Sequence, residues 1–119
     1  MPRELTLVTR RPPTVDELRD AAREHDPDAI VANVRNGAVQ MVLDARRDVI
    51  LSMQYSTFVG VPDEIATRQP AAATAVPGPA FWTEVWIPFG PTGHRSAAIA
   101  RGIAERCQGV CADESGELL

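Results

Sequence analysis

The chain has 119 residues and a formal net charge of −4 at pH 7, with 45% hydrophobic and 24% charged residues. These values fit one globular domain and exclude a disordered acidic chain, and the acidic balance argues against nucleic-acid binding, which needs a basic patch. All 12 basic residues are arginines, so the sequence offers no lysine for Schiff-base or phosphate-loop chemistry.

No stretch of the sequence has the composition of a membrane span. The longest uncharged stretches, 49–62 and 69–83, contain prolines and are shorter than the ~20 apolar residues that a spanning helix needs. The N-terminus has no apolar signal core, so we expect a cytoplasmic protein without a membrane partner. Cys107 and Cys111 have neither redox nor zinc spacing, so we expect no metal and no cofactor, and leave open whether they are bonded.

The first two elements are a strand and a helix. Residues 4–9 alternate weakly between apolar and polar side chains, which predicts a short strand. Thr14 and Glu17 then form a capping box, which predicts a helix that runs to about His25. Pro27 stops that helix, because a proline disfavours helical backbone at the residue before it.

A β-hairpin is the clearest signal in the chain. Asn36-Gly37 separates two alternating runs, and both residues of such a two-residue turn must adopt positive φ. Counting back from the turn pairs apolar residues on one face. The predicted pairs are Val34 with Val39, Ala32 with Met41, and Ile30 with Leu43.

A third strand is expected over 49–55, which also alternates. A three-residue turn would place Leu43 opposite Leu51 and Met41 opposite Met53. The three strands would then form an antiparallel meander with one strongly apolar face.

Residues 56–80 lose all periodicity and are rich in proline and alanine, which predicts a long loop of a functional or disordered kind, with one helical turn over 62–68. A strand follows over 81–87, then a helix over about 94–108, with Gly109 as its left-handed cap and 110–112 as an edge strand. The order β-α-β-β-β-loop-β-α-β over 1–119 predicts a single α+β domain. We expect a two-layer sandwich, ferredoxin-like, with a mostly antiparallel sheet and both helices on one face.

Two surfaces are candidates for binding. Trp82, Glu84 and Trp86 share the strand face that points away from the helices, and exposed aromatics beside a charge are typical of binding hot spots. The full set of candidate partner-binding residues is Trp82, Glu84, Trp86, Tyr55, Asp26 and Asp28. Alternatively, the 56–80 loop covers the tryptophans, or a homodimer forms through them.

The second surface is the loop that opens the last helix. Its candidate anion-binding residues are Gly93, His94, Arg95 and Ser96, because backbone N–H groups at a helix start attract anions. A polar first turn without a ligand is the other interpretation. His25 and His94 are the two histidines of the chain, and no set of nucleophile, base and acid is visible. We therefore expect a protein that is not an enzyme.

The meander around Asn36-Gly37, the strand over 81–88 and the alanine-rich helix that ends at 107–110 resemble small immunity proteins of bacterial polymorphic toxin systems in their arrangement. The resemblance implies a non-enzymatic domain that neutralises a toxin by stoichiometric binding, and the acidic balance of the chain leads us to expect a basic toxin domain. The resemblance includes no shared sequence motif, so it assigns no functional role to any particular residue. The alternative function is a regulatory domain that binds an anion or small ligand at the loop before the second helix.

Overall fold

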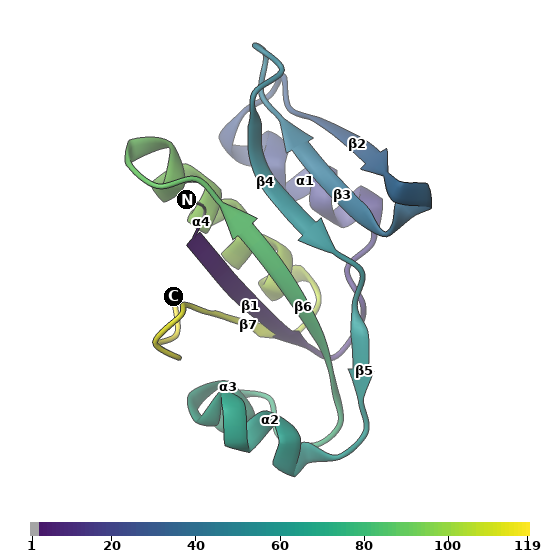
Figure 1. The fold of residues 1–119 in the computed structure, drawn as a ribbon, viewed down its shortest axis with the longest axis vertical. Helices are drawn as coiled ribbons and strands as arrows, with labels where there is room; N and C mark the ends of the chain where they lie inside the picture. The colour runs from purple at the N-terminus through teal and green to yellow at the C-terminus, as the bar shows by residue number, and fades with distance from the viewer. Residues whose placement is uncertain (1–2) are drawn as a thin grey trace.

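In the computed structural model, which describes residues 3–119, seven strands form one antiparallel sheet and four α-helices pack on it (Figure 1). The first two residues of the expected 1–119 domain lie outside this range. The strands are β1 (Arg3–Thr9), β2 (Ile30–Val34), β3 (Val39–Leu43), β4 (Val49–Gln54), β5 (Thr57–Val59), β6 (Ala80–Ile87) and β7 (Val110–Ala112). The helices are α1 (Val15–His25), α2 (Pro62–Arg68), α3 (Pro70–Ala75) and α4 (Pro91–Arg106).

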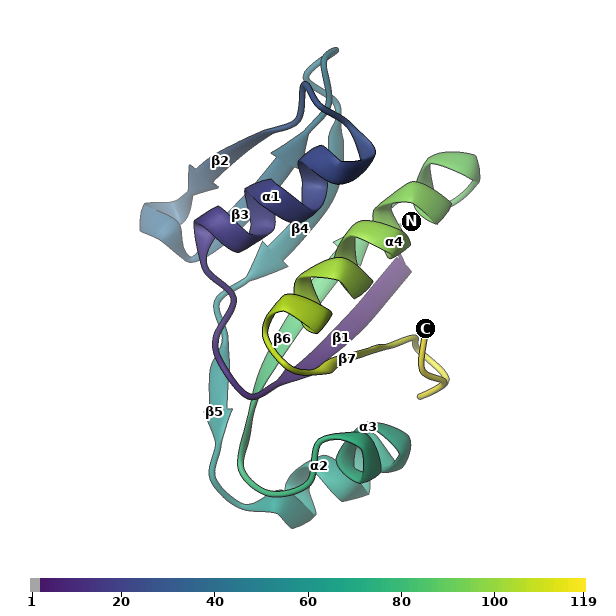
Figure 2. The same ribbon diagram turned by 180° about the vertical axis from the view of Figure 1, so that it is seen from behind.

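The predicted α+β class is confirmed, and the two long helices α1 and α4 lie on the same face of the sheet (Figure 2). The strand order is β2-β3-β4-β6-β1-β7, and β5 pairs with the first three residues of β6, Ala80 to Trp82. Since β6 and β7 are both antiparallel to β1, they run parallel to each other, and α4 connects them over β1. This is a split β-α-β unit. An ion pair between Glu24 and Arg106 joins the two long helices.

The hairpin and its register are confirmed, but the turn is wider than predicted, because Arg35 also has a positive φ of 52° and residues 35–37 form a 3-10 turn between the last ladder pair. Asn36 and Gly37 have φ values of 57° and 87°, and the Ala38 N–H donates to the Arg35 carbonyl at 3.1 Å. All three predicted cross-strand pairs between β2 and β3 are present. The capping box is confirmed as well: the Glu17 N–H donates to the Thr14 hydroxyl at 3.2 Å at the start of α1.

The predicted register between β3 and β4 is wrong by one residue. Val42 lies opposite Leu51 and Gln40 opposite Met53, with a register shift between Val42 and Leu43. The physical reason is the turn: one Asp44 carboxylate oxygen accepts from the N–H groups of Arg46 and Asp48. The Asp44 N–H donates to the Asp48 carbonyl at 3.0 Å, so the three-residue turn encloses 45–47, with Arg47 at φ 67°, one residue earlier than the predicted pairs require.

The shifted register divides the expected apolar face between the two sides of the sheet. Val42, Leu51 and Met53 are buried in the core under α1 and α4. Because side chains alternate along a strand, Met41 and Leu43 point to the opposite side, where they are half-buried. We call this opposite side of the sheet the outer face.

The prediction of a long loop over 56–80 is wrong except for its helical turn over 62–68. This segment forms β5, α2 and α3, and the two short helices cover one end of the outer face (Figure 1). Prolines open both helices, and alanine has the highest helix propensity, so a composition typical of a linker becomes helical once it packs. Ile65, Ala72 and Val76 are buried against Val8 of β1.

The last helix differs from its prediction at both ends. α4 begins at Pro91 rather than near position 94, after Gly90 at φ 85°. At its other end the left-handed residue is Gln108, at φ 58°, and not Gly109. Gly109 is required for a different reason: a Cβ there would lie 2.1 Å from the Val8 carbonyl oxygen. The glycine therefore allows the chain to pass close to β1.

This assignment predicts opposite results for two neighbouring substitutions. Gly109→Ala should lower the free energy of unfolding by about 2–3 kcal/mol, because the new methyl group collides with backbone. Gln108→Gly should leave it unchanged or raise it by up to about 1 kcal/mol, because glycine removes left-handed strain. Urea denaturation of both variants checks this, and the reverse order would make Gly109 the left-handed cap.

Cys107 and Cys111 are free and buried. Burial is the largest effect on both thiols and raises the pKa of each to about 12, with Glu17 adding to the rise at Cys107 and Asp113 at Cys111. Neither thiol is therefore a nucleophile at neutral pH.

The thiols provide a test of the core. At pH 8 about one thiol in 10⁴ is ionised when the pKa is near 12, so a disulfide reagent should leave the native protein unmodified for hours. After denaturation both thiols should react within minutes. Rapid reaction of either cysteine in the native state, followed by mass spectrometry, would contradict the described burial.

Candidate binding face

The outer face is organised in rows that cross the sheet. One row runs through paired residues of five strands: Ala32, Met41, Ser52, Trp86 and Glu4. Trp86 is 43% exposed, and on β3, which lies beyond β4, Met41 and Leu43 of the same face are half-buried without a covering helix among the described residues. This end of the outer face, which we call the Trp86 end, is therefore an uncovered apolar surface that meets a carboxylate at β1.

An apolar groove lies at the Trp86 end. β4 and β6 pair at Ser52–Trp86 and Met53–Val85, and beyond these pairs the two strands separate. The hollow between them has a volume of about 420 Å³. Its lining residues are Val49, Leu51, Ser52, Trp86, Ile87, Pro88 and Phe89. Val49, Trp86 and Phe89 are exposed at its rim, which is unusual for large apolar side chains gathered in one place.

Trp82 lies at the other end of the outer face and has a different environment. It is half-buried and packs against the cluster formed by α2 and α3. The Arg68 guanidinium carbon lies 4.5 Å from the centre of a Trp82 ring, a cation–π geometry. The indole N–H is buried without a hydrogen-bond partner. Thus the segment 56–80 covers Trp82, as one interpretation held, and leaves Trp86 open, as the other did.

Carboxylates surround Trp82. A cavity of about 260 Å³ between β5, β6 and α2 is lined by Glu64, Glu84, Arg68 and Trp82, among others. A second cavity, of about 230 Å³, lies across Trp82 and Arg68 from the first. Its walls are Glu4, Thr6, Arg68, Gln69, Trp82, Asp113 and Glu114. Five carboxylates thus face two cavities that share one arginine, so this end of the outer face is acidic.

Asp113 keeps its charge at neutral pH. The Ser115 hydroxyl donates to Asp113 Oδ1 at 2.6 Å. The N–H groups of Ser115 and Glu117 donate to the same oxygen at 2.9 and 3.0 Å. The Ser115 hydrogen bond is the largest effect and lowers the pKa of Asp113, against a smaller opposing effect of burial. The carboxylate therefore also holds the C-terminal turn in place.

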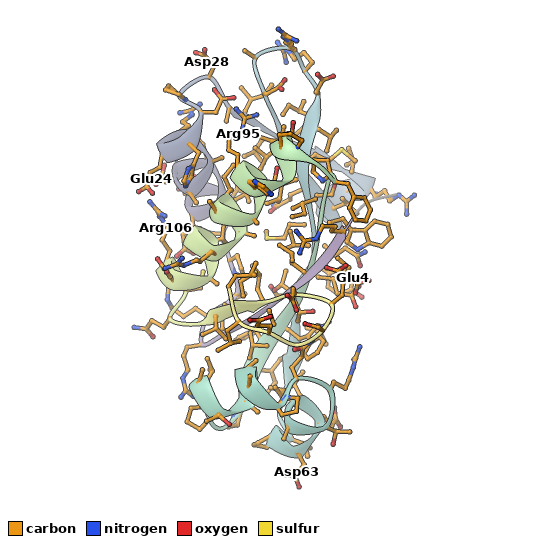
Figure 3. The ribbon with its side chains drawn as sticks, turned by 90° about the vertical axis from the view of Figure 1, so that its left-hand side faces the viewer. Glu4, Glu24, Asp28, Asp63, Arg95 and Arg106 are labelled. Carbon is orange, nitrogen blue, oxygen red and sulfur yellow. The ribbon has the colours of Figure 1, made fainter. Side chains whose placement is uncertain are left out.

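Four of the predicted partner-binding residues share the outer face. Tyr55, which is highly exposed, lines a small hollow together with Trp82 and Glu84, and Trp86 follows along the same strand. Asp26 and Asp28 lie elsewhere, at the end of α1 on the helical side, as the positions of Asp28 and Glu4 in Figure 3 show. Asp26 is half-buried, and its carboxylate lies 3.9 Å from the Arg95 guanidinium.

The four candidate anion-binding residues fall within the first turns of α4. Gly93 and Ser96 are buried, and a Cβ at Gly93 would lie 2.2 Å from the Pro88 carbonyl oxygen. The Ser96 hydroxyl donates to the Thr92 carbonyl, and Arg95 faces Asp26. His94 is exposed. Packing and internal contacts therefore account for three of the four.

Sequence reasoning missed the residues that the segment 56–80 contributes, chiefly Glu64, Arg68 and Gln69. One signal could have found them: Pro62 followed by Asp63 and Glu64 is typical of a helix first turn. It also missed Phe89 and Val49, because nothing in their local pattern reveals that β4 and β6 separate.

Comparison of the chain with models of known protein families, with curated proteins and with solved structures gives no match. Over residues 3–119, no three histidine, cysteine, aspartate or glutamate side chains form a group that could hold a metal ion. Within the same range, every helix is too short or too polar to cross a membrane.

The two tryptophans should respond differently to substitution. Trp82→Ala should lower the free energy of unfolding by about 2–4 kcal/mol, because it removes a ring that packs under α2 and α3. Trp86→Ala should change it by less than about 1 kcal/mol, because its ring is exposed. Chemical denaturation measures both, and equal losses would mean that Trp86 is covered too.

Proposed function

We propose that the chain is a non-enzymatic protein-binding domain whose outer face docks on a basic partner. The observation that carries the proposal is the exposed apolar rim of Val49, Trp86 and Phe89 around a groove, on the sheet face that α1 and α4 leave open. Large aromatic side chains in such a setting dominate binding energies at protein interfaces.

The charges beside this rim favour a basic partner. Glu4 is paired with Trp86 across the strands, and Glu84 is on the same face of β6. Glu64, Asp113 and Glu114 extend the acidic surface beyond them. Complementary charge speeds association and selects against wrong partners more than it adds affinity.

This combination fits the immunity-protein hypothesis. An inhibitor that neutralises a toxin by stoichiometric binding needs a rigid surface and no chemistry of its own. An aromatic anchor with an acidic surround suits a nuclease-like or otherwise basic toxin surface, because such a surface is itself positively charged. The proposed partner is thus a protein with a basic face that admits the Trp86 rim.

The test is affinity capture from the native host, identification of the bound protein, and titration of the purified pair. Trp86→Ala should weaken binding at least about tenfold, which is roughly 1.4 kcal/mol. Phe58→Ala is the matched control, because Phe58 is an exposed aromatic that pairs with Phe81 on the other side of the sheet. This control should bind like the wild type, and binding should weaken with added salt.

Two outcomes would count against the proposal. Unchanged partner binding by both Trp86→Ala and Phe89→Ala would remove the groove from the interface. A stable dimer in light scattering that Trp86→Ala converts to monomer would assign the Trp86 end to a second copy of the chain instead of to a foreign partner.

A further inference from the structure

We propose that strand β2 is a dimer interface, at which two copies of the chain pair antiparallel and continue one sheet across the contact. The inference goes beyond the proposed function, because it concerns the edge of the sheet and not its outer face. β2 is the first strand in the order β2-β3-β4-β6-β1-β7, and Figure 1 shows it as the outermost strand. In the part of the chain that the structure describes, no strand lies on its other side.

β2 lacks the features that usually protect an edge strand. Such edges are commonly very short, bulged, or interrupted by a charged residue or a proline. The five residues of β2, Ile-Val-Ala-Asn-Val over Ile30–Val34, include no charge and no proline. All five pair with β3 in unbroken register, so no bulge turns the strand away. Every second residue therefore directs its backbone N–H and C=O groups away from β3, and no loop backbone of residues 3–119 bonds to them.

The opposite edge of the sheet is protected by the chain itself. β7 is three residues long, and the C-terminal segment pairs with it. Ala112 forms an antiparallel bridge with Leu118, and the Leu119 N–H donates to the Cys111 carbonyl at 2.9 Å. Of the two strands that end the sheet, β2 is thus the longer one and the one that stays open.

Two-fold symmetry restricts the register of such a pair. An axis perpendicular to the sheet keeps each face on its own side, so one residue must lie opposite its own copy. Ala32 is the middle residue of β2, and only a pair centred there uses the whole strand. Ile30 then lies opposite Val34 of the second copy, twice by symmetry, and branched apolar pairs of this kind stabilise a sheet. The small Ala32 side chain lets the two strands approach closely.

The charges at the ends of β2 favour a second copy in this orientation. Asp28 precedes the strand and Arg35 follows it, both are exposed, and neither makes an ion pair within residues 3–119. Centring on Ala32 places Asp28 opposite Asn36 of the second copy, and therefore next to its Arg35. A parallel pair would bring like charges together. A foreign strand would need matching charges of its own, whereas a second copy supplies them by symmetry.

The first experiment measures self-association of the full chain by sedimentation over a concentration series. The wild type should be dimeric at about 1 mM and monomeric near 1 μM, because an edge contact is smaller than a standard interface. Amide hydrogen exchange gives the location. The β2 amides that point away from β3 should exchange more slowly at the higher concentration, and the amides of α4 should not change.

Charged variants at the centre of β2 test the register. Ala32→Lys and Ala32→Glu each place a charge opposite its own copy, so each variant alone should self-associate at least about thirtyfold more weakly than the wild type. An equal mixture of the two should form a heterodimer, because lysine then lies opposite glutamate. Circular dichroism should show both variants folded, since Ala32 is half-buried on the outer face.

Matched controls make the same changes elsewhere. Ala66 is an exposed alanine on α2, and Ala66→Lys and Ala66→Glu should dimerise like the wild type. Trp86→Ala should dimerise like the wild type too, because β3 and β4 separate Trp86 from β2.

The proposal is overturned if the wild type is monomeric at about 1 mM, if the Ala32 variants still dimerise, or if their mixture stays monomeric. A dimer that Trp86→Ala dissociates and Ala32→Lys does not would place the contact at the Trp86 end and overturn it as well. These measurements use the chain alone. Failure of the β2 pairing therefore leaves the proposed function to partner titration, and a failed partner titration leaves the dimer result intact.

Discussion

The two-residue alternation of β6 is the constraint on which the rest of the structure depends. Thr83, Val85 and Ile87 point under the long helices and are buried, so Trp82, Glu84 and Trp86 must point to the outer face. β6 pairs with β1 from Phe81 to Ile87 and with β4 and β5 on its other side. A one-residue slip of this strand would move both tryptophans into the core and three buried residues out of it.

The position of each tryptophan along β6 then decides its role. Trp82 lies where α2 and α3 reach the sheet, so its ring becomes part of a second small core with Val8 and Ile65. Trp86 lies four residues further on, where β6 pairs with β4. Nothing in the described chain covers the sheet at that point. Covered and open surface thus meet on one strand, with Glu84 between them. The acidic cavities occupy this boundary, because the short helices end there without filling it.

The sequence predicts those features that local chemistry determines. Asn36-Gly37 determines its own hairpin because few residue pairs accept two positive φ values, and Thr14 with Glu17 marks the start of α1. The β3–β4 register could not be predicted, because it depends on which backbone N–H groups donate to the Asp44 carboxylate and on a bulge in this strand pair. The segment 56–80 resembles a linker in composition, and packing against Val8 makes it helical. The outer-face residues of β6 could be predicted because the alternation of that strand is local. Gln69 and Arg68 could not, because their positions depend on how the segment 56–80 packs.

The short pairing between β4 and β6 also affects how the domain unfolds. Two residue pairs join the β2–β4 meander to the strands around β1, and α1 adds contacts from above. One hydrophobic core cluster under α1 and α4 spans both halves, so we expect packing rather than backbone hydrogen bonds to hold them together at this junction. The groove at Trp86 lies on the line between the two halves. A partner bound in the groove would contact both halves of the sheet. Its binding should therefore slow amide hydrogen exchange throughout β2, β3 and β4, and not only at the residues that it contacts.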